Sequence, residues 1–199
     1  MLKELAEFLV AQIFDFGYPG IFILMAIESS FIPFPSEIVL IPAGYLASQE
    51  KMNLGMIFVS AILGSMVGAF INYYLAYFVG RKFLEKFGKY FFISNDALTK
   101  MDTFFEKHGA ISTFTGRLIP GIRQLISIPA GLAHMDILKF SLFTALGAGL
   151  WSLILILLGY FIGENQELIN QYLKQITLII FILVIMFLIL YYKIKIKKV

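Results

Sequence analysis

Long apolar stretches, interrupted at a few places by charge and proline, dominate the chain. Three of them carry no charged residue and cover residues 54–80, 140–163 and 175–192. A hydrocarbon core about 30 Å thick requires about 17–25 helical residues to cross it. We therefore expect three membrane-crossing helices.

Two further apolar regions are interrupted. Two glutamates and the prolines at 33, 35 and 42 divide residues 16–49, and two arginines and two prolines divide residues 109–135. Each uncharged piece has about 12 residues or fewer, which rise only about 18 Å as a helix. Since proline also removes a backbone donor, the chain there needs protein or water rather than lipid as its partner. We predict two re-entrant helical hairpins, shaped by Pro33, Pro42, Gly44, Pro120, Pro129 and Gly131.

The two interrupted regions resemble each other. Residues 31–44, FIPFPSEIVLIPAG, align with residues 118–131, LIPGIRQLISIPAG, and after a small shift Leu63 and Gly64 align with Leu146 and Gly147. If neither hairpin crosses the membrane, only one membrane-crossing helix separates the two repeats. The second repeat must then have the opposite orientation in the membrane, as in the inverted repeats of secondary transporters.

The expected architecture is an all-α membrane protein. It has two inverted repeats, each a re-entrant helical hairpin followed by a transmembrane helix, plus a C-terminal transmembrane helix. The whole chain, 1–199, forms a single membrane domain. Its expected parts are repeat 1 at about 17–80, an amphipathic connector at 81–109, repeat 2 at about 110–163 and the last span at 175–192.

Lysine placement predicts the orientation. The connector carries five lysines and Arg81, and the chain ends in KIKIKKV, so the positive-inside rule places both in the cytoplasm. The loop at 164–174 then falls outside. Within the connector, residues 94–108 are expected to form an amphipathic surface helix that begins at Ser94 and stops at Gly109. Residues 1–15 are expected to lie at a membrane interface.

Composition narrows the class of protein further. A hydrophobic share of 59%, a charged share of 15% and a mean hydropathy of +0.84 exclude a water-soluble domain. Cysteine is absent, which excludes disulfides and thiol chemistry. His108 and His134 lack carboxylates at ligand spacing, so we expect no metal and no cofactor. The lysines lie at span ends and not on one basic face, so we expect no nucleic-acid partner.

Four charged residues within the hairpins require an explanation. A lone ionised side chain at mid-bilayer costs about 2.5–3.5 kcal/mol even on the most lenient scale. The first hairpin supplies only the carboxylates Glu28 and Glu37, and the second only the guanidiniums Arg117 and Arg123. Hairpins that enter from opposite faces would bring these charges together near the midplane. The alternative is that the arginines reach the interface and the glutamates anchor a hairpin tip.

The residue types indicate a function for such a cluster. A guanidinium presents a planar fork that binds phosphate oxygens in a bidentate way, so Arg117 and Arg123 are the candidates to bind the phosphate of an anionic lipid. Burial disfavours the charged form of a carboxyl group. Glu28 and Glu37 are therefore the candidates to couple transport to protons.

Three motifs carry a resemblance to a known family. They are E-x4-P-x-P-x-E in the first hairpin, the end of the first span from Tyr74 to Arg81, and F-x2-R-x2-P-x2-R followed by S-x-P-A-G in the second hairpin. Together they resemble the bacterial DedA family, whose domain is also called VTT or SNARE-associated, and the resemblance covers about residues 10–192.

The resemblance implies an inner-membrane protein with two re-entrant hairpins, related to lipid scramblases. Some members of that family recycle undecaprenyl phosphate, and others are linked to proton-dependent envelope homeostasis. It also implies important roles for Glu28, Arg117 and Arg123. Glu37 matches less closely, because some members carry an aspartate a few residues later.

We therefore predict a proton-coupled flippase or scramblase for an anionic lipid such as undecaprenyl phosphate. The expected location is a bacterial or archaeal plasma membrane, with a membrane lipid and protons as partners and self-association left open. A proton or cation antiporter for membrane-potential and pH homeostasis would have little use for two arginines, and a membrane assembly factor also stays open. An enzyme would need a nucleophile beside a base or a carboxylate cluster for a metal, and neither histidine lies in such an array.

Overall fold

Helices make up most of the described chain. The computed structural model describes residues 16–30, 35–87, 95–163 and 165–196, and no strand occurs among them. This confirms the all-α prediction. The helical elements are α2 (Tyr18–Glu28), α3 (Glu37–Ser48), α4 (Leu54–Leu75), the π-helical turn η1 (Ala76–Gly80), α5 (Arg81–Phe87), α6 (Asn95–Leu118), α7 (Ser127–Leu132), α8 (Ile137–Ile162) and α9 (Gln166–Ile196).

Three of the described helices are long and apolar enough to cross a membrane. They are Leu54–Leu84, Ile137–Ile162 and Glu167–Lys193, so the prediction of three candidate spans is confirmed. The first span continues past its predicted end at residue 80, because η1 leads directly into α5. In contrast, α2 and α3 have 11 and 12 residues and rise only about 16–18 Å.

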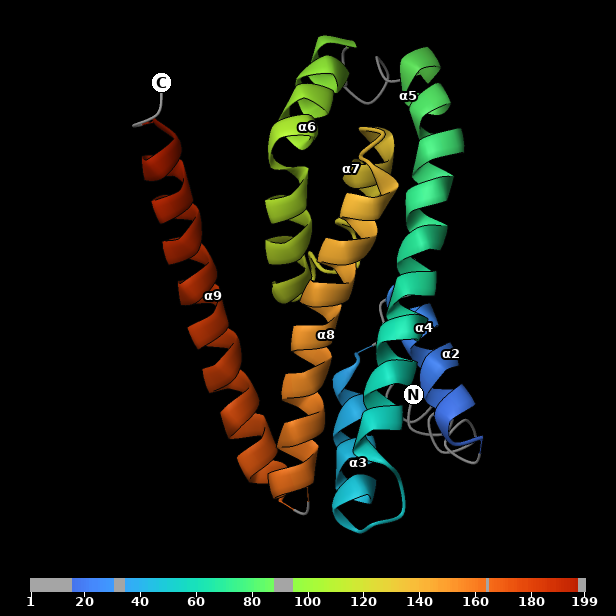
Figure 1. Ribbon diagram of the computed structural model, residues 1–199, viewed down its shortest axis with the longest axis vertical. Coiled ribbons are helices and arrows are strands. Elements are labelled where there is room, and N and C mark those ends of the chain that lie inside the picture. The colour runs from blue at the N-terminus through green and yellow to red at the C-terminus, as the bar shows by residue number, and fades with distance from the viewer. Residues whose placement is uncertain (1–15, 31–34, 88–94, 164, 197–199) are drawn as a thin grey trace.

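The described helices outside the three candidate spans lie in pairs at opposite ends of the bundle, α2 with α3 and α6 with α7. In Figure 1, α2 and α3 lie beside the lower parts of α4 and α8, whereas α6 and α7 lie beside their upper parts. The first helix of each pair packs on the span that follows it, α2 on α4 and α6 on α8. The second helix packs on the other span, α3 on α8 and α7 on α4. Each pair therefore bridges both spans.

Glycines allow the second helix of each pair to lie directly against a span. A Cβ atom at Gly44 in α3 would lie 2.1 Å from the carbonyl oxygen of Ile156 in α8. A Cβ atom at Gly131 in α7 would lie 2.2 Å from the carbonyl oxygen of Tyr73 in α4. Both distances are far below van der Waals contact, so only glycine permits these close helix contacts.

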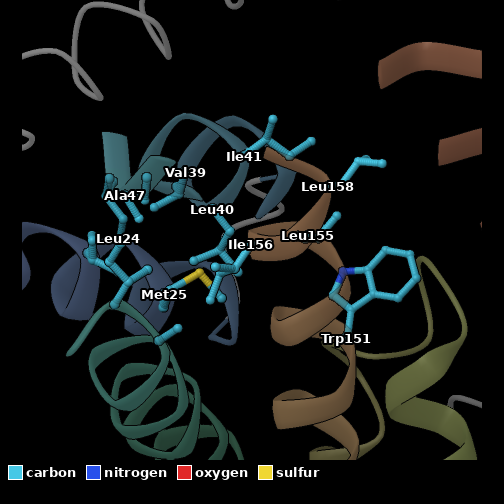
Figure 2. Packing of buried hydrophobic residues seen from close by; sticks show 14 of the residues in the cluster. Leu24, Met25, Val39, Leu40, Ile41, Ala47, Trp151, Leu155, Ile156 and Leu158 are labelled. Carbon is cyan, nitrogen blue, oxygen red and sulfur yellow. The ribbon is translucent and has the colours of Figure 1, made fainter. Parts of the chain in front are cut away.

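The larger hydrophobic core lies between α2, α3, α4 and α8. Figure 2 shows Leu24 and Met25 of α2 facing Val39 and Leu40 of α3, with Ile156 of α8 beside them. Burial of these side chains fixes the first hairpin on both spans. Large apolar side chains on the outer faces of α4, α8 and α9 are exposed, as expected for helices that contact lipid.

The predicted end of the connector helix was wrong. Helix α6 does not stop at Gly109 but continues to Leu118. A Cβ atom at Gly109 would lie 3.0 Å from the Sδ atom of Met135, so this glycine makes room for packing. The predicted connector and the first arm of the second hairpin are therefore one helix. The predicted cap Ser94 and residues 1–15 lie outside the described residues.

The predicted loop at 164–174 is also wrong, because α9 begins at Gln166. The side-chain oxygen of Asn165 accepts a hydrogen bond of 3.0 Å from the backbone N–H of Leu168, which satisfies a donor at the helix start. Ile169 is buried. A cap and an apolar face therefore convert this polar stretch into the first turns of α9.

The lysine-bearing segments lie at one end of the bundle. Helix α5, the start of α6 and the end of α9 are together at the top of Figure 1. A hydrogen bond of 3.0 Å between Nδ1 of His108 and the hydroxyl of Tyr191 connects α6 with α9 there. Three crossings that alternate in direction require these segments to share one side. That this side is the cytoplasm remains a prediction.

Candidate functional site

The four charged residues lie where α2 is followed by α3, here called the first tip, and where α6 is followed by α7, here called the second tip. Helix α2 ends at Glu28 and α3 begins at Glu37. Arg117 lies in the last turn of α6, and Arg123 lies between α6 and α7. Each charge therefore lies at or beside a helix end rather than within a long helix.

The second tip is a hydrogen-bonded turn. The carbonyl oxygen of Ile119 accepts from the N–H groups of Ile122, at 3.1 Å, and Arg123, at 3.0 Å. Gly121 has φ of 81°, a left-handed conformation that favours glycine, and Pro120 before it has a fixed φ. These bonds set the backbone position of Arg123.

Serines at the ends of α2 and α3 flank the first tip. The hydroxyl of Ser30 donates to the carbonyl oxygen of Ile27 at 2.6 Å, and the carbonyl oxygen of Ser36 accepts from the N–H of Leu40 at 2.8 Å. Pro33 lies outside the described residues. Pro42 and Pro129 lie inside α3 and α7, which continue past them.

An ion-pair cluster joins the two tips. Nε of Arg123 lies 3.0 Å from Oε1 of Glu28, and Nη2 of Arg123 lies 3.4 Å from Oε1 of Glu37. The side chains of Arg123 and Glu28 are 10% and 5% exposed, whereas that of Glu37 is 26% exposed. Arg123 and Glu28 thus form the buried pair, and Glu37 approaches from the rim.

Polar and aromatic side chains surround this pair. The hydroxyl of Ser29 donates to Oε2 of Glu28 at 2.9 Å. The guanidinium of Arg123 lies 5.2 Å from the ring centroid of Trp151, within the range of a cation–π interaction. The indole N–H of Trp151 donates to the hydroxyl of Ser36 at 3.4 Å. Trp151 of α8 therefore contacts groups from both hairpins.

Arg117 is buried without a carboxylate. It is 3% exposed, and among the described residues it makes no ion pair. Its Nη2 donates to the hydroxyl of Ser127 at 2.8 Å, but its Nε has no hydrogen-bond partner there. A buried cation with an unsatisfied donor is costly unless an anion joins it. The geometry therefore favours an anionic ligand.

A small cavity separates the two arginines. It has a volume of about 10 Å³ and is lined by Glu28, Arg117, Arg123, Trp151 and serines of the surrounding helices. One water needs about 10–15 Å³, so the cavity has no room for a phosphate group. Nη1 of Arg123, like Nε of Arg117, lacks a hydrogen-bond partner among the described residues. The site can bind a larger anion only after the tips separate.

The histidines lie outside this site. His134 stacks on Tyr77 with 4.2 Å between the ring centroids, and His108 contacts Tyr191. Among the described residues there is no group of three histidine, aspartate or glutamate side chains that could hold a metal ion. The described part of the site therefore contains no histidine.

Sequence reasoning found the four charges but missed three residues that organise them. Ser127 binds Arg117, Trp151 lies beside Arg123, and Asn72 of α4 donates to the carbonyl oxygens of both tips. A signal existed for Asn72, because an amide within an otherwise apolar span needs a partner. No comparable signal marked Trp151, whereas Ser127 is the serine of the S-x-P-A-G motif, although the motif alone gave it no partner.

The comparisons with known proteins find a family. The VTT domain matches residues 34–161. No solved structure matches the chain.

Several bacterial proteins are similar to this chain along most of its length. "Uncharacterized membrane protein YkoX" of Bacillus subtilis is 39% identical over 197 residues, which cover 99% of this chain and 87% of that protein. "Alkaline phosphatase-like protein" of Lactococcus lactis is 33% identical and covers 96% and 92%. "Undecaprenyl phosphate transporter A" of Bacillus subtilis is 34% identical and covers 91% and 89%.

Proposed function

Because the chain belongs to the DedA family of VTT-domain membrane proteins, we propose that it moves an anionic lipid of the polyprenyl phosphate class, such as undecaprenyl phosphate, across the membrane. The observation that carries this proposal is the buried cluster in which Arg123 pairs with two carboxylates beside Arg117. The name of the transporter relative from Bacillus subtilis supports the substrate class.

A lipid phosphate can replace the carboxylates of the site as the negatively charged partner of Arg123. Arg123 is neutralised by Glu28 and Glu37, while Arg117 has no carboxylate partner among the described residues. A phosphate group has several oxygens that can accept hydrogen bonds from both guanidinium groups, and it binds a guanidinium in a bidentate way. Because the cavity admits about one water, the tips must separate before the headgroup enters. The polyprenyl tail stays in the lipid.

Proton uptake supplies the exchange step. Protonation of Glu28 removes its negative charge and releases Arg123 for the phosphate. Loss of the proton restores the ion pair and expels the phosphate. Proton binding at Glu28, assisted by Glu37 at the rim, therefore alternates with phosphate binding by Arg117 and Arg123.

Inverted repeats would give both faces of the membrane access to this site. The offset that aligns Leu63 with Leu146 also aligns Tyr73 with Ile156. These two residues provide the carbonyl groups that Gly131 and Gly44 approach most closely, and the two glycines are themselves aligned. Equivalent positions thus make equivalent contacts, which supports two inverted copies of a re-entrant hairpin and a span.

The four charged groups come from a single chain, so the site does not require a second copy. We place the protein in a bacterial or archaeal plasma membrane, with residues 81–109 and the C-terminus in the cytoplasm, because these segments carry the lysines.

The experiment uses purified protein in liposomes that contain a phosphorylated polyprenol. A phosphatase that cannot cross the membrane is added outside, so it dephosphorylates inner-leaflet lipid only if that lipid is moved outward. We expect the protein to expose the inner pool, and Arg117→Gln and Arg123→Gln to prevent this. If the inner-leaflet lipid stays phosphorylated although folded protein is inserted in the liposomes, lipid transport is refuted.

Two controls in the same liposomes separate the alternatives. Phosphate release without added phosphatase would favour an enzyme, as the lactococcal relative's name suggests for that protein. Dissipation of a pH gradient in liposomes that lack polyprenyl phosphate would favour an antiporter. We expect neither effect.

A further inference from the structure

Asn72 connects the two hairpin tips from the span α4. Its Nδ2 donates to the carbonyl oxygen of Ser29 and to that of Gln124, each at 3.2 Å, and the residue is 1% exposed. Ser29 directly follows Glu28, and Gln124 directly follows Arg123. One amide group therefore holds the backbone beside both members of the buried ion pair.

The orientation of this amide is determined by its partners. Both partners are carbonyl oxygens, which only accept, so the nitrogen of Asn72 must face them. Its two hydrogens are then used, and its Oδ1 is buried with no hydrogen-bond partner among the described residues. An unsatisfied buried acceptor is unfavourable, so the two hydrogen bonds that Asn72 donates must offset this cost.

Backbone packing brings Asn72 within reach of the first tip. One turn earlier in α4, a Cβ atom at Gly68 would lie 2.3 Å from the carbonyl oxygen of Ala26 and 2.9 Å from Cβ of Ser29. Helix α4 thus lies directly against the end of α2. The short side chain of Asn72 can then span the remaining distance to both tips.

We propose that Asn72 is a positioning residue that holds the two tips at the separation at which Arg123 meets Glu28. At least one of its two hydrogen bonds must break when the tips part, so Asn72 stabilises the closed site and sets how easily it opens. The role of Asn72 in transport rests on the proposed function, in which the opened site admits a lipid phosphate.

Spin labels can measure the separation of the tips directly. The chain contains no cysteine, so Ile23→Cys in α2 and Leu125→Cys in the second tip provide a unique pair. Both positions are exposed, at 46% and 55%. Electron–electron distance measurements are made on the full chain in nanodiscs, with and without substitutions at Asn72.

We expect Asn72→Leu and Asn72→Ala, which remove both donors, to broaden the distance distribution towards longer values. Asn72→Gln keeps both donors and should restore a distribution close to that of the unsubstituted pair. Thr144→Val is the matched control, because it removes a buried hydroxyl that has no partner among the described residues. This control should leave the distances unchanged.

An unchanged distribution in Asn72→Ala would overturn the inference, as would equal broadening in Thr144→Val. The Ala and Gln variants decide the question if Asn72→Leu does not fold. The distance measurement does not depend on lipid transport, so it can refute the positioning role of Asn72 without refuting the proposed function, and the reverse. Protein that moves no polyprenyl phosphate but responds at Asn72 would refute the proposed function and support the positioning role.

Discussion

Nε of Arg123 lies 3.0 Å from Oε1 of Glu28, although the two residues belong to different hairpins. Both side chains are almost fully buried, so each has lost most of its water. Mutual attraction offsets part of that cost only while the two groups stay together. The pair therefore couples the position of one hairpin tip to that of the other.

Loss of one partner from this pair should be strongly destabilising. Arg123→Gln leaves Glu28 buried without its counter-charge, and we expect a decrease of about 3–5 kcal/mol in the free energy of unfolding. Denaturant unfolding in detergent measures it. The double variant Glu28→Gln with Arg123→Gln removes both charges, and it should recover most of the stability while transport stays absent. A single variant as stable as the native protein would contradict the buried pair.

Arg117 should behave in the opposite way. Its charge is buried and no carboxylate of the described residues contacts it directly, although Glu28 lines the same small cavity. Arg117→Gln therefore removes a buried cation that has no salt bridge. We expect stability to be unchanged or higher, because only the bond to Ser127, about 1 kcal/mol, is lost. Transport of polyprenyl phosphate should nevertheless be abolished, and exposed Lys139→Gln should retain it. A loss of stability as large as that of Arg123→Gln would show that Arg117 is structural.

Glu28 should control the pH dependence of transport. In the proposed exchange, protonation of Glu28 releases Arg123, so we expect transport to increase as pH falls in the native protein. Glu28→Gln removes this titration, and its transport rate should be flat over the same pH range. Glu37→Gln is the matched control, since Glu37 is more exposed and lies farther from Arg123 at 3.4 Å, and it should keep most of the dependence. Identical pH profiles in the native protein and Glu28→Gln would exclude Glu28 as the coupling group.

The equivalent glycines Gly44 and Gly131 should be equally intolerant of a methyl group. An alanine at either position would force a backbone carbonyl of α8 or α4 to move, and we expect each to cost about 1–3 kcal/mol of stability. Gly149→Ala is the control, because its nearest neighbour, at 3.2 Å, is the flexible end of the Ile62 side chain. Strong destabilisation at only one of the two positions would argue against equivalent packing.

The four charges of the site could be found from sequence because an ionised residue in an apolar segment has few structural explanations. Their partners could not be found in this way. Whether Arg123 meets Glu28 or Glu37 depends on the turn around Gly121 and on the depth of each tip. Those are properties of packing between segments that are distant in the chain.

Helix ends show the same limit. Gly109 has the sequence features of a helix stop, yet it makes room for Met135, which lies in the connection between α7 and α8. The start of α9 could have been predicted, because Asn165 is a favoured cap residue and an apolar position, Ile169, follows it. Trp151 resembles an ordinary residue of an apolar helix. Ser127 belongs to the S-x-P-A-G motif, but only the contact with Arg117 reveals its place in the site.

Trp151 provides the most direct test of the central claim, that a lipid phosphate binds the arginines between the two tips. It is the only tryptophan in the chain, and it lies 5.2 Å from the guanidinium of Arg123, so its fluorescence reports on this site. Protein in nanodiscs is titrated with a phosphorylated polyprenol and, separately, with the unphosphorylated alcohol. We predict a saturable fluorescence change with the phosphorylated lipid alone, lost in Arg117→Gln. Equal responses to both lipids, or no response in protein that transports the lipid, would contradict it.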